Sequence, residues 1–185
     1  SGHYSRIEVV GSTDTYKDDY DWPGMMRAAE LLSHADPGVI CWNGSKGGSI
    51  GLHNDRTLCA RITEATGKPA TTSSLAILEA FRATGVRRFG LVTPYADAYA
   101  SRIPPHFLAE GFTCSDQAHS GLTDNLSYCS ASDHDITQMI RAVRRAKKSS
   151  APPPDDALLD RGGHPAVPVD CTTIAPDDLL PMEAL

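Results

Sequence analysis

Strand-like and helix-like segments alternate along this sequence, and that order constrains the fold more than any other feature. Short runs rich in β-branched and aromatic residues are followed by longer segments in which apolar residues recur every three or four positions. This alternation is typical of an α/β fold with a largely parallel sheet. The expected strands are 6–10, 39–42, 69–72, 89–93, 112–115 and 166–169.

Several helices have identifiable ends in the sequence. The first is stopped by Asp36-Pro37-Gly38, and a helix over 55–66 is closed by Gly67. A later helix, from about Asp97, meets Pro104-Pro105, which must end or kink it. Further helices are expected to begin at Ser73 or Ser74, at Asp133 and at Pro176.

Two of the expected strands, 39–42 and 166–169, are each followed at the C-terminal end by a small polar loop. In open α/β sheets, ligands bind at this edge. The segment 149–165 is rich in Pro, Gly, Ser and Asp and should be a mobile loop. We therefore expect a cleft in which the two polar loops face each other.

The charge and hydropathy of the chain argue against two classes of partner. Its 185 residues carry a net charge of −6 and its pI is about 5.6, which is unfavourable for a nucleic-acid or anionic-membrane surface. The one dense basic run, 141–148, ends a helical pattern, where cations complement the helix dipole. No apolar run approaches the roughly 20 residues that cross a bilayer.

The cysteines and histidines indicate neither a disulfide scaffold nor a metal site. None of the five cysteines forms a C-x-x-C pair, and the seven histidines are scattered. We therefore expect a reducing cytoplasm, no metal ion and mostly buried thiols. The chain opens at Ser1 without a secretory signal and enters a strand-like run at once, so we expect an upstream piece to be missing.

A loop rich in glycine and serine, Trp42-Asn-Gly-Ser-Lys-Gly-Gly-Ser-Ile-Gly51, follows the strand over 39–42. Glycines allow backbone N–H groups to approach an anion closely. The spacing is not that of a Walker or dinucleotide motif, because Lys46 comes too early and no G-x-G-x-x-G follows the strand. From the loop alone, a turn without a ligand and a cradle for a carboxylate are equally good interpretations.

Three motifs that follow this loop in order resemble one branch of a known superfamily. They are Thr66-Gly-Lys-Pro-Ala-Thr-Thr-Ser73, Thr93-Pro-Tyr95 and, after the last expected strand, Asp170-Cys-Thr-Thr173. Together they resemble the branch of the aspartate/glutamate racemase superfamily that holds maleate cis–trans isomerase and arylmalonate decarboxylase. The resemblance runs from about Arg6 to the end of the chain and is weakest over 97–165.

This resemblance implies an α/β fold of two flavodoxin-like lobes with parallel sheets and pseudo-twofold symmetry. We expect residues 1–94 to form the first lobe and 95–185 the second, with the Pro-rich loop 149–165 inside the second lobe. The family's N-terminal strand and its final strand and helices have no counterpart in this sequence. We therefore expect terminal elements of both lobes to be missing.

The resemblance also implies roles for individual residues. Cys171 matches the cysteine that gives a proton to the substrate α-carbon. Gly44 falls where racemases and maleate isomerases place a second catalytic cysteine and where arylmalonate decarboxylase has glycine. Ser45 and Lys46 fall where the branch has Thr-Ser, whose hydroxyls and backbone donors hold the substrate carboxylate. Tyr95 matches the tyrosine of T-P-Y, another carboxylate donor.

Three further residues complete the expected substrate site. Asn125 resembles an asparagine that maleate isomerase uses on its substrate. Asn43 and Thr172 lie next to the glycine and the cysteine of the matching motifs. Lys46 departs from the family, because it brings a long cation where a small hydroxyl residue is usual, and it would either strengthen anion binding or block it.

These residues predict a cofactor-independent enzyme that acts at the α-carbon of a small carboxylate or dicarboxylate. Proton transfer next to a carboxylate forms an enediolate, whose charge on the carboxylate oxygens is stabilised by preorganised donors. Cys171 lies between a strand and the start of a helix, where a thiolate is favoured, and the alternative is a small buried core residue. A single cysteine opposite Gly44 suits decarboxylation followed by one-sided protonation.

Other functions stay open at this point. One alternative is maleate cis–trans isomerase or aspartate/glutamate racemase activity. Another is a catalytically inactive relative that binds a carboxylate, which Lys46 and the missing ends favour. The expected partner is a small carboxylate substrate, with no organic cofactor, nucleic acid or membrane, and a homo-oligomer is left open.

Several other polar or aromatic residues are expected to serve the structure alone. Cys41 and Cys59 should be core residues, and Trp42 and Tyr128 should pack against neighbours. Asp55 should cap the helix that follows the Gly-rich loop.

Overall fold

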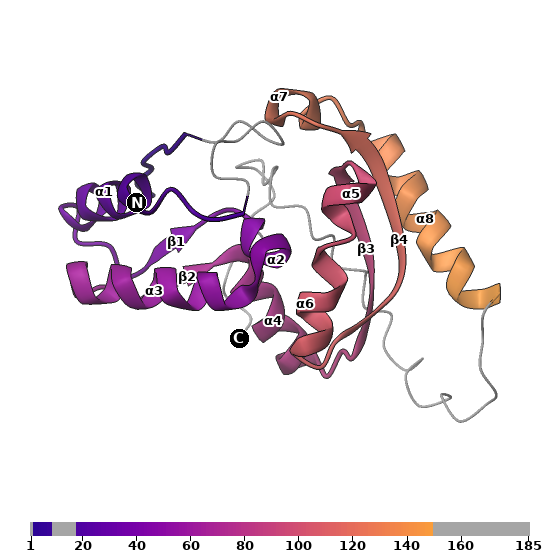
Figure 1. Ribbon diagram of the computed structural model, residues 1–185, viewed down its shortest axis with the longest axis horizontal. Coiled ribbons are helices and arrows are strands. Elements are labelled where there is room, and N and C mark those ends of the chain that lie inside the picture. Colours follow the sequence, from indigo (N-terminus) through magenta and orange to yellow (C-terminus); the bar gives the residue numbers. More distant parts are fainter. Residues whose placement is uncertain (1, 9–17, 150–185) are drawn as a thin grey trace.

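The structure is a computed structural model that describes residues 2–8 and 18–149. In this part of the chain, two small parallel sheets are flanked by helices, which confirms the expected α/β class (Figure 1). Parallel neighbours need a crossover connection, usually a helix, and both pairs have one. The pairs are β1 (Ile40–Trp42) with β2 (Ala70–Thr72), and β3 (Arg88–Tyr95) with β4 (Thr113–Leu122).

The first sheet packs against α1 (Trp22–Ser33) and α3 (Leu52–Thr66), which also contact each other. Asp21 caps α1, because its carboxylate accepts a hydrogen bond from the backbone N–H of Gly24 at 3.1 Å. Gly67, at φ +70°, ends α3 in the left-handed region that favours glycine. The buried side chains of this core are Tyr20, Met25, Ala29, Ile40, Ile50, Leu58 and Ile62.

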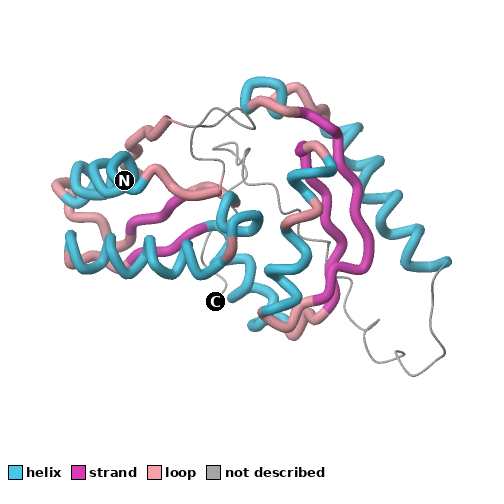
Figure 2. Tube along the Cα trace, viewed as in Figure 1, coloured by secondary structure: helices cyan, strands magenta, loops and turns pink. Residues whose placement is uncertain are grey.

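The second sheet is covered by helices on both faces (Figure 2). Phe89 of β3 belongs to the core shared with α6 (Ile103–Ala109). The next residue, Gly90, faces α8 (Asp133–Ser149), where a Cβ would lie 2.3 Å from Val143 Cγ1. Successive strand residues point to opposite faces, so α6 and α8 lie on opposite sides of the sheet.

Helix α4 (Ser73–Thr84) joins the two sheets. It begins directly after β2, yet its buried apolar side chains lie in the core of the second sheet. The buried side chains of this second core are Leu52, Leu78, Phe81, Phe89, Leu91, Ile103, Phe107 and Phe112. The Phe81 ring is 5.3 Å from the rings of Phe89 and Phe112 and 6.3 Å from that of Phe107, measured between centroids. The expected lobe boundary at 94–95 stays a prediction.

The structure corrects two expectations about proline. β3 does not break at Pro94-Tyr95 but runs through them, with a register shift between Thr93 and Tyr95. Pro104-Pro105 do not end a helix at that point, because the segment from Asp97 is a single turn, α5 (Asp97–Ala100), and the prolines begin α6. Proline is tolerated in a first helical turn, since the N–H that it lacks would have no helical partner there.

Other differences are local. The Gly-rich loop contains a short helix, α2 (Lys46–Ile50), and β4 is much longer than expected. The caps of α4 and α8 are Thr72 and Ser132 rather than Ser73 or Ser74 and Asp133. Residues 6–8, the described part of the first expected strand, form no strand.

Part of the prediction lies outside the described residues. This applies to the loop from residue 150 onward, the strand over 166–169 and the helix from Pro176. In the part that is described, no helix is both long and apolar enough to cross a membrane.

Asp55 is a buried carboxyl rather than a helix cap. Its exposed fraction is 0%, and Gly51 holds the N-cap position of α3. Burial raises the pKa of Asp55, and the hydroxyls of Thr72 and Tyr20 partly oppose that rise. The cap interpretation is therefore wrong, because the start of α3 is covered by α2 and the first core.

Replacing Asp55 with asparagine should raise the melting temperature, and by more near pH 7 than near pH 4. A carboxyl with a raised folded pKa stabilises the fold fully only below its unfolded pKa of about 3.9, and loses that contribution as the pH rises through the folded pKa. Asparagine does not titrate and avoids this loss, which is about 1.4 kcal/mol per unit of pKa shift, or a few degrees. Thermal unfolding followed by circular dichroism measures the difference.

Asp135 provides a control, because its replacement should change stability with pH in the opposite direction. It is exposed, and hydrogen bonds from the hydroxyl (2.6 Å) and backbone N–H (3.2 Å) of Ser132 lower its pKa. Asp135→Asn should therefore lose stability near neutral pH and approach wild type as the pH falls. A difference between Asp55→Asn and wild type that stays constant over the whole pH range would contradict a raised pKa at Asp55.

Candidate functional site

The C-terminal ends of β1 and β3 meet at a pair of hydroxyl groups. Ser45 follows β1, Tyr95 is the last residue of β3, and Ser45 Oγ lies 3.0 Å from Tyr95 Oη. Both side chains are partly buried. The two hydroxyls thus come from different sheets and lie at the strand edge where α/β proteins bind ligands.

A second hydroxyl pair supports the first. Ser49 of α2 is 1% exposed, and its Oγ lies 2.7 Å from Tyr99 Oη and 2.9 Å from the carbonyl oxygen of Lys46. The Tyr95 ring packs edge-on against the rings of Tyr99 and Tyr128, with centroids 5.0 Å and 5.3 Å away. Sequence reasoning missed Ser49 and Tyr99; the signal was a tyrosine four residues after Tyr95, opposite a serine-rich loop.

The other expected substrate residues are arranged around these pairs. Asn43 is exposed, and its Oδ1 accepts a hydrogen bond from Ser73 Oγ at 3.1 Å, which ties the loop to the start of α4. Lys46 is the first residue of α2 and is partly buried. Asn125 begins α7 (Asn125–Tyr128), the short helix whose Tyr128 contacts Tyr95. Cys171 and Thr172 lie outside the described residues.

Gly44 could not carry a side chain without moving Trp42. A Cβ at Gly44 would lie 2.4 Å from Cζ2 and 2.5 Å from Cε2 of the Trp42 ring. An indole is rigid and its Nε1 is buried, so the ring does not give way easily. The expectation that Trp42 packs against neighbours is confirmed, and its contact explains the glycine that follows it.

None of the described cysteines forms a disulfide. Burial, with the Asp55 carboxylate, raises the pKa of the Cys59 thiol to about 11, and burial also raises that of Cys114. Cys41 is exposed rather than a core residue. It alternates with buried Ile40 along β1 and therefore points to the other face of the strand.

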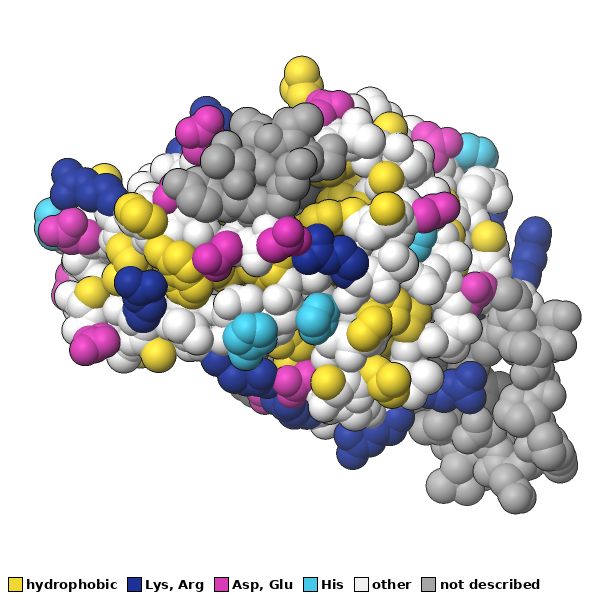
Figure 3. All heavy atoms as spheres, in the orientation of Figure 1, with side chains coloured by type: hydrophobic (Ala, Val, Ile, Leu, Met, Phe, Trp, Pro, Cys, Tyr) yellow, Lys and Arg dark blue, Asp and Glu magenta, His cyan; other side chains and the backbone are white. Residues whose placement is uncertain are grey.

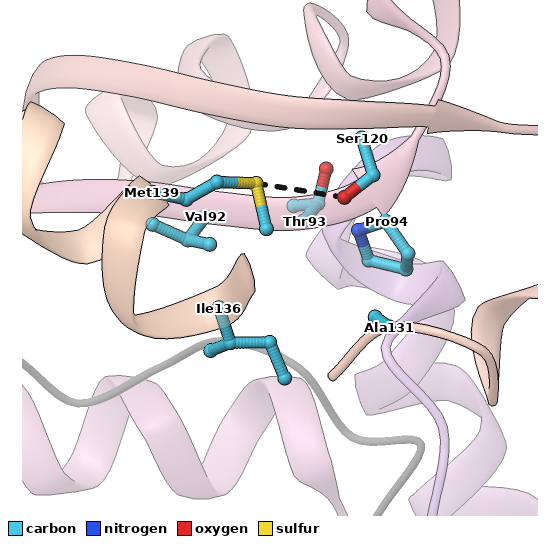
Figure 4. Close-up of a pocket in the computed structure, with 7 residues that line it drawn as sticks. All are labelled: Val92, Thr93, Pro94, Ser120, Ala131, Ile136 and Met139. Atoms are coloured by element: carbon cyan, nitrogen blue, oxygen red, sulfur yellow. Dashed lines mark hydrogen bonds between the residues drawn. The ribbon is translucent and has the colours of Figure 1, made fainter. Parts of the chain in front are cut away.

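A small pocket lies between the second sheet and α8, and neither Ser45 nor Tyr95 lines it (Figure 4). Ser120 Oγ donates to Met139 Sδ at 3.5 Å across it. With about 20 Å³ it holds no more than one or two waters, so it is not a carboxylate site. Its lining residues are Val92, Thr93, Pro94, Ser120, Ala131, Ile136 and Met139.

On the face drawn in Figure 3, charged side chains of one sign do not gather into a single large patch. Acidic and basic side chains are interspersed there. Several charged side chains of the described residues form ion pairs. Glu110 holds both Arg56 and Arg82, at 2.7 Å and 3.0 Å. This mixed face does not resemble a nucleic-acid surface.

A curated relative shares sequence with this chain. It is the arylmalonate decarboxylase of Bordetella bronchiseptica, which is 33% identical over 106 residues. That stretch is 57% of this chain and 42% of the relative, so the chain spans less than half of the relative's length.

Solved structures share the fold. The maleate isomerase Iso of Pseudomonas putida S16, solved as a cysteine-to-alanine variant with maleate, has a TM-score of 0.69 and 24% identity, covering 77% of this chain and 59% of its own. The maleate cis–trans isomerase of Nocardia farcinica, solved with a covalently bound succinylcysteine intermediate, has a TM-score of 0.67 and 20% identity, covering 80% and 62%.

The match to a family model extends over most of the chain. The arylmalonate decarboxylase model covers residues 28–175, from α1 through the Gly-rich loop and both described sheets to the Cys171 motif. The hydroxyl pair at the strand ends lies within this range, as does the glycine at position 44. The chain therefore belongs to the arylmalonate decarboxylase family.

Proposed function

We propose that this protein catalyses carbon-acid chemistry at the α-carbon of a small carboxylate, in the manner of an arylmalonate decarboxylase and without a cofactor. In this reaction a substrate carboxylate leaves as CO₂, its bonding electrons form an enediolate on the remaining carboxylate, and Cys171 protonates the α-carbon. The observation that carries the proposal is the 3.0 Å approach of Ser45 Oγ to Tyr95 Oη at the ends of two strands.

The two hydroxyls suit a developing enediolate. Each can donate one hydrogen bond, and they approach from different sheets, so one carboxylate group can meet both. The packing of Tyr95 between Tyr99 and Tyr128 fixes its ring before substrate binds. Donors fixed in this way need little reorganisation when charge accumulates on the carboxylate oxygens.

The glycine at position 44 favours decarboxylation over racemisation. A two-sided mechanism needs a second proton donor on the opposite face of the substrate, and Gly44 supplies no side chain. The Trp42 ring also occupies the space that a Cβ at this position would need. A site with one thiol, and with no proton donor on the opposite face of the substrate, fits protonation from a single side.

The relatives support this class of substrate and chemistry. One neighbour was solved with maleate, a small dicarboxylate, and another with a succinyl group on a cysteine. Both share the fold of this chain at identities of 24% and 20%. They support a small carboxylate as ligand and a cysteine as the reactive residue.

A second candidate is a relative that binds a carboxylate without turning it over. Lys46 supports it, because a partly buried cation stands at the start of α2, where the family has a small hydroxyl residue. Incubation with phenylmalonate, maleate and L-aspartate in separate assays separates the candidates. CO₂ release from phenylmalonate supports the decarboxylase; thermal stabilisation without turnover supports the binding protein; exchange between L- and D-aspartate overturns the proposal.

Removing either hydroxyl should lower kcat/KM for phenylmalonate by about 10²-fold, since each is a donor to the enediolate. The variants are Tyr95→Phe and Ser45→Ala, assayed by CO₂ release. Tyr4→Phe is a matched control, because Tyr4 is 94% exposed and removing its hydroxyl should not change the rate. Equal rates for Tyr95→Phe and Tyr4→Phe would mean that Tyr95 is not a carboxylate donor.

Replacing Cys171 with serine should lower kcat by roughly 10²–10⁴-fold, because a serine hydroxyl is a far weaker acid than a thiol. The dissociation constant for a non-reacting dicarboxylate should change little, since Ser45 and Tyr95 are untouched. Steady-state kinetics and isothermal titration calorimetry measure the two effects separately.

Cys41→Ser and Cys59→Ser are the controls for that prediction. Cys41 is exposed on β1, outside the motifs assigned to the substrate. Burial raises the pKa of Cys59 to about 11, so that thiol is poorly suited to proton transfer at neutral pH. Both variants should keep kcat within a few-fold of wild type. If Cys41→Ser loses turnover while Cys171→Ser keeps it, the assignment of the proton donor is wrong.

A further inference from the structure

A group of buried polar atoms without hydrogen bonds lies beneath the Gly-rich loop. They are the hydroxyl of Tyr20, the indole N–H of Trp42 and both carboxyl oxygens of Asp55, none of which has a hydrogen bond of normal geometry to a described residue. Asp55 is 0% exposed and Tyr20 is 1% exposed. Buried polar groups are nearly always paired, so this group requires an explanation.

Two members of the group contact the glycines of the loop directly. A Cβ at Gly47 would lie 1.3 Å from Asp55 Oδ2, so the carboxyl occupies the space beside the Gly47 backbone. The Trp42 ring occupies the corresponding space beside Gly44. These two glycines flank Ser45 and Lys46, and the loop segment between them is therefore supported from below at both ends.

Tyr20 connects the two supports. Its hydroxyl faces both the Asp55 carboxyl and the Trp42 N–H, and burial together with the Asp55 charge raises the pKa of Tyr20. From β2, the Thr72 hydroxyl faces Asp55 as well, and the same oxygen accepts a hydrogen bond from the backbone N–H of Leu75 at 3.1 Å. The other titratable neighbours of Asp55 are Arg56 and Cys59, on its own helix.

A carboxyl is an unfavourable choice for this position if stability alone matters. An apolar residue of similar volume would fill the space beside Gly47 without the cost of burying polar oxygens. Groups that reduce stability are commonly retained where they serve a binding or catalytic site. Here the carboxyl lies beside Gly47, which directly follows Ser45 and Lys46, the two loop residues assigned to the substrate carboxylate.

We propose that Asp55 is a positioning residue for the carboxylate site, which acts with Tyr20 and Trp42 by holding the segment Gly44–Gly47 against Tyr95. The role rests on the proposed function, because it is the placement of Ser45 that gives Asp55 an effect on substrate. Asp55 itself does not touch the substrate. A displacement of about 1 Å in such a segment can cost about 10²-fold in rate.

The test compares Asp55→Leu, Asp55→Asn and Tyr20→Phe in the full chain. Asp55→Leu keeps the volume and removes the polar group, so kcat/KM for phenylmalonate should fall by about 10²-fold. Asp55→Asn keeps the planar group beside Gly47 and should restore kcat/KM to within a few-fold. Tyr20→Phe removes one hydroxyl and should lower kcat/KM by about tenfold. Because this change is smaller, it keeps the test decisive if Asp55→Leu does not fold.

Hydrogen–deuterium exchange gives a readout that does not depend on turnover. Amides of residues 46–50 should exchange about tenfold faster in Asp55→Leu and Tyr20→Phe than in wild type, while those of α8 should not change. Phe112→Leu is the matched control: it should destabilise the second core, where Phe112 is 0% exposed, and leave exchange at 46–50 unchanged.

The outcomes separate the two proposals. Wild-type protein that neither binds nor decarboxylates phenylmalonate contradicts the proposed function, and exchange at 46–50 still decides whether Asp55 holds the loop. Unchanged exchange at 46–50 in both Asp55→Leu and Tyr20→Phe overturns the positioning role. So does a fall in kcat/KM in Asp55→Leu no larger than that in Phe112→Leu, because it would reflect general destabilisation alone.

Discussion

The hydrogen bond between Ser45 and Tyr95 is the contact on which the site depends. It joins residues 50 positions apart and brings together the end of β1 in one sheet and the end of β3 in the other. Neither short sheet would hold it alone. The contact forms because α4 begins at β2 and buries Leu78 and Phe81 in the second core, so the two sheets are fixed relative to each other.

Two separate constraints explain the glycines of the Gly-rich loop. Its glycines allow a close approach of the backbone to an anion, as expected for a carboxylate site. Gly44 and Gly47 are also required by their neighbours, because the Trp42 ring and the Asp55 carboxyl occupy the places where their side chains would lie. The shape of the loop is thus set by the side chains packed beneath it, which links the stability of the first core to the geometry of the candidate site.

Two residues of the loop bear on the proposed chemistry. Lys46 directly follows Ser45 at the start of α2, where in the proposed function its cation adds electrostatic attraction for a dicarboxylate but also takes up space. The Trp42 ring occupies the space that a side chain at position 44 would need. Both features agree with the proposed function, in which the site binds an anion and protonates it from one direction.

The sequence by itself determined the α/β class, most strand and helix positions and the family motifs, because periodicity, glycine stops and short motifs are local signals. The resemblance that those motifs carry also selected Ser45 and Tyr95 as candidate substrate residues. Part of the local structure escaped it: β4 was longer than expected because its polar residues lack the usual strand pattern, and α2 was hidden by glycines. Only the tertiary structure decided that Ser45 meets Tyr95 and that Asp55 is a buried carboxyl and not the cap of α3. The physical reason is that burial and contact between distant residues depend on how α2, α3 and α4 pack against one another and against the two sheets. No single segment encodes that packing.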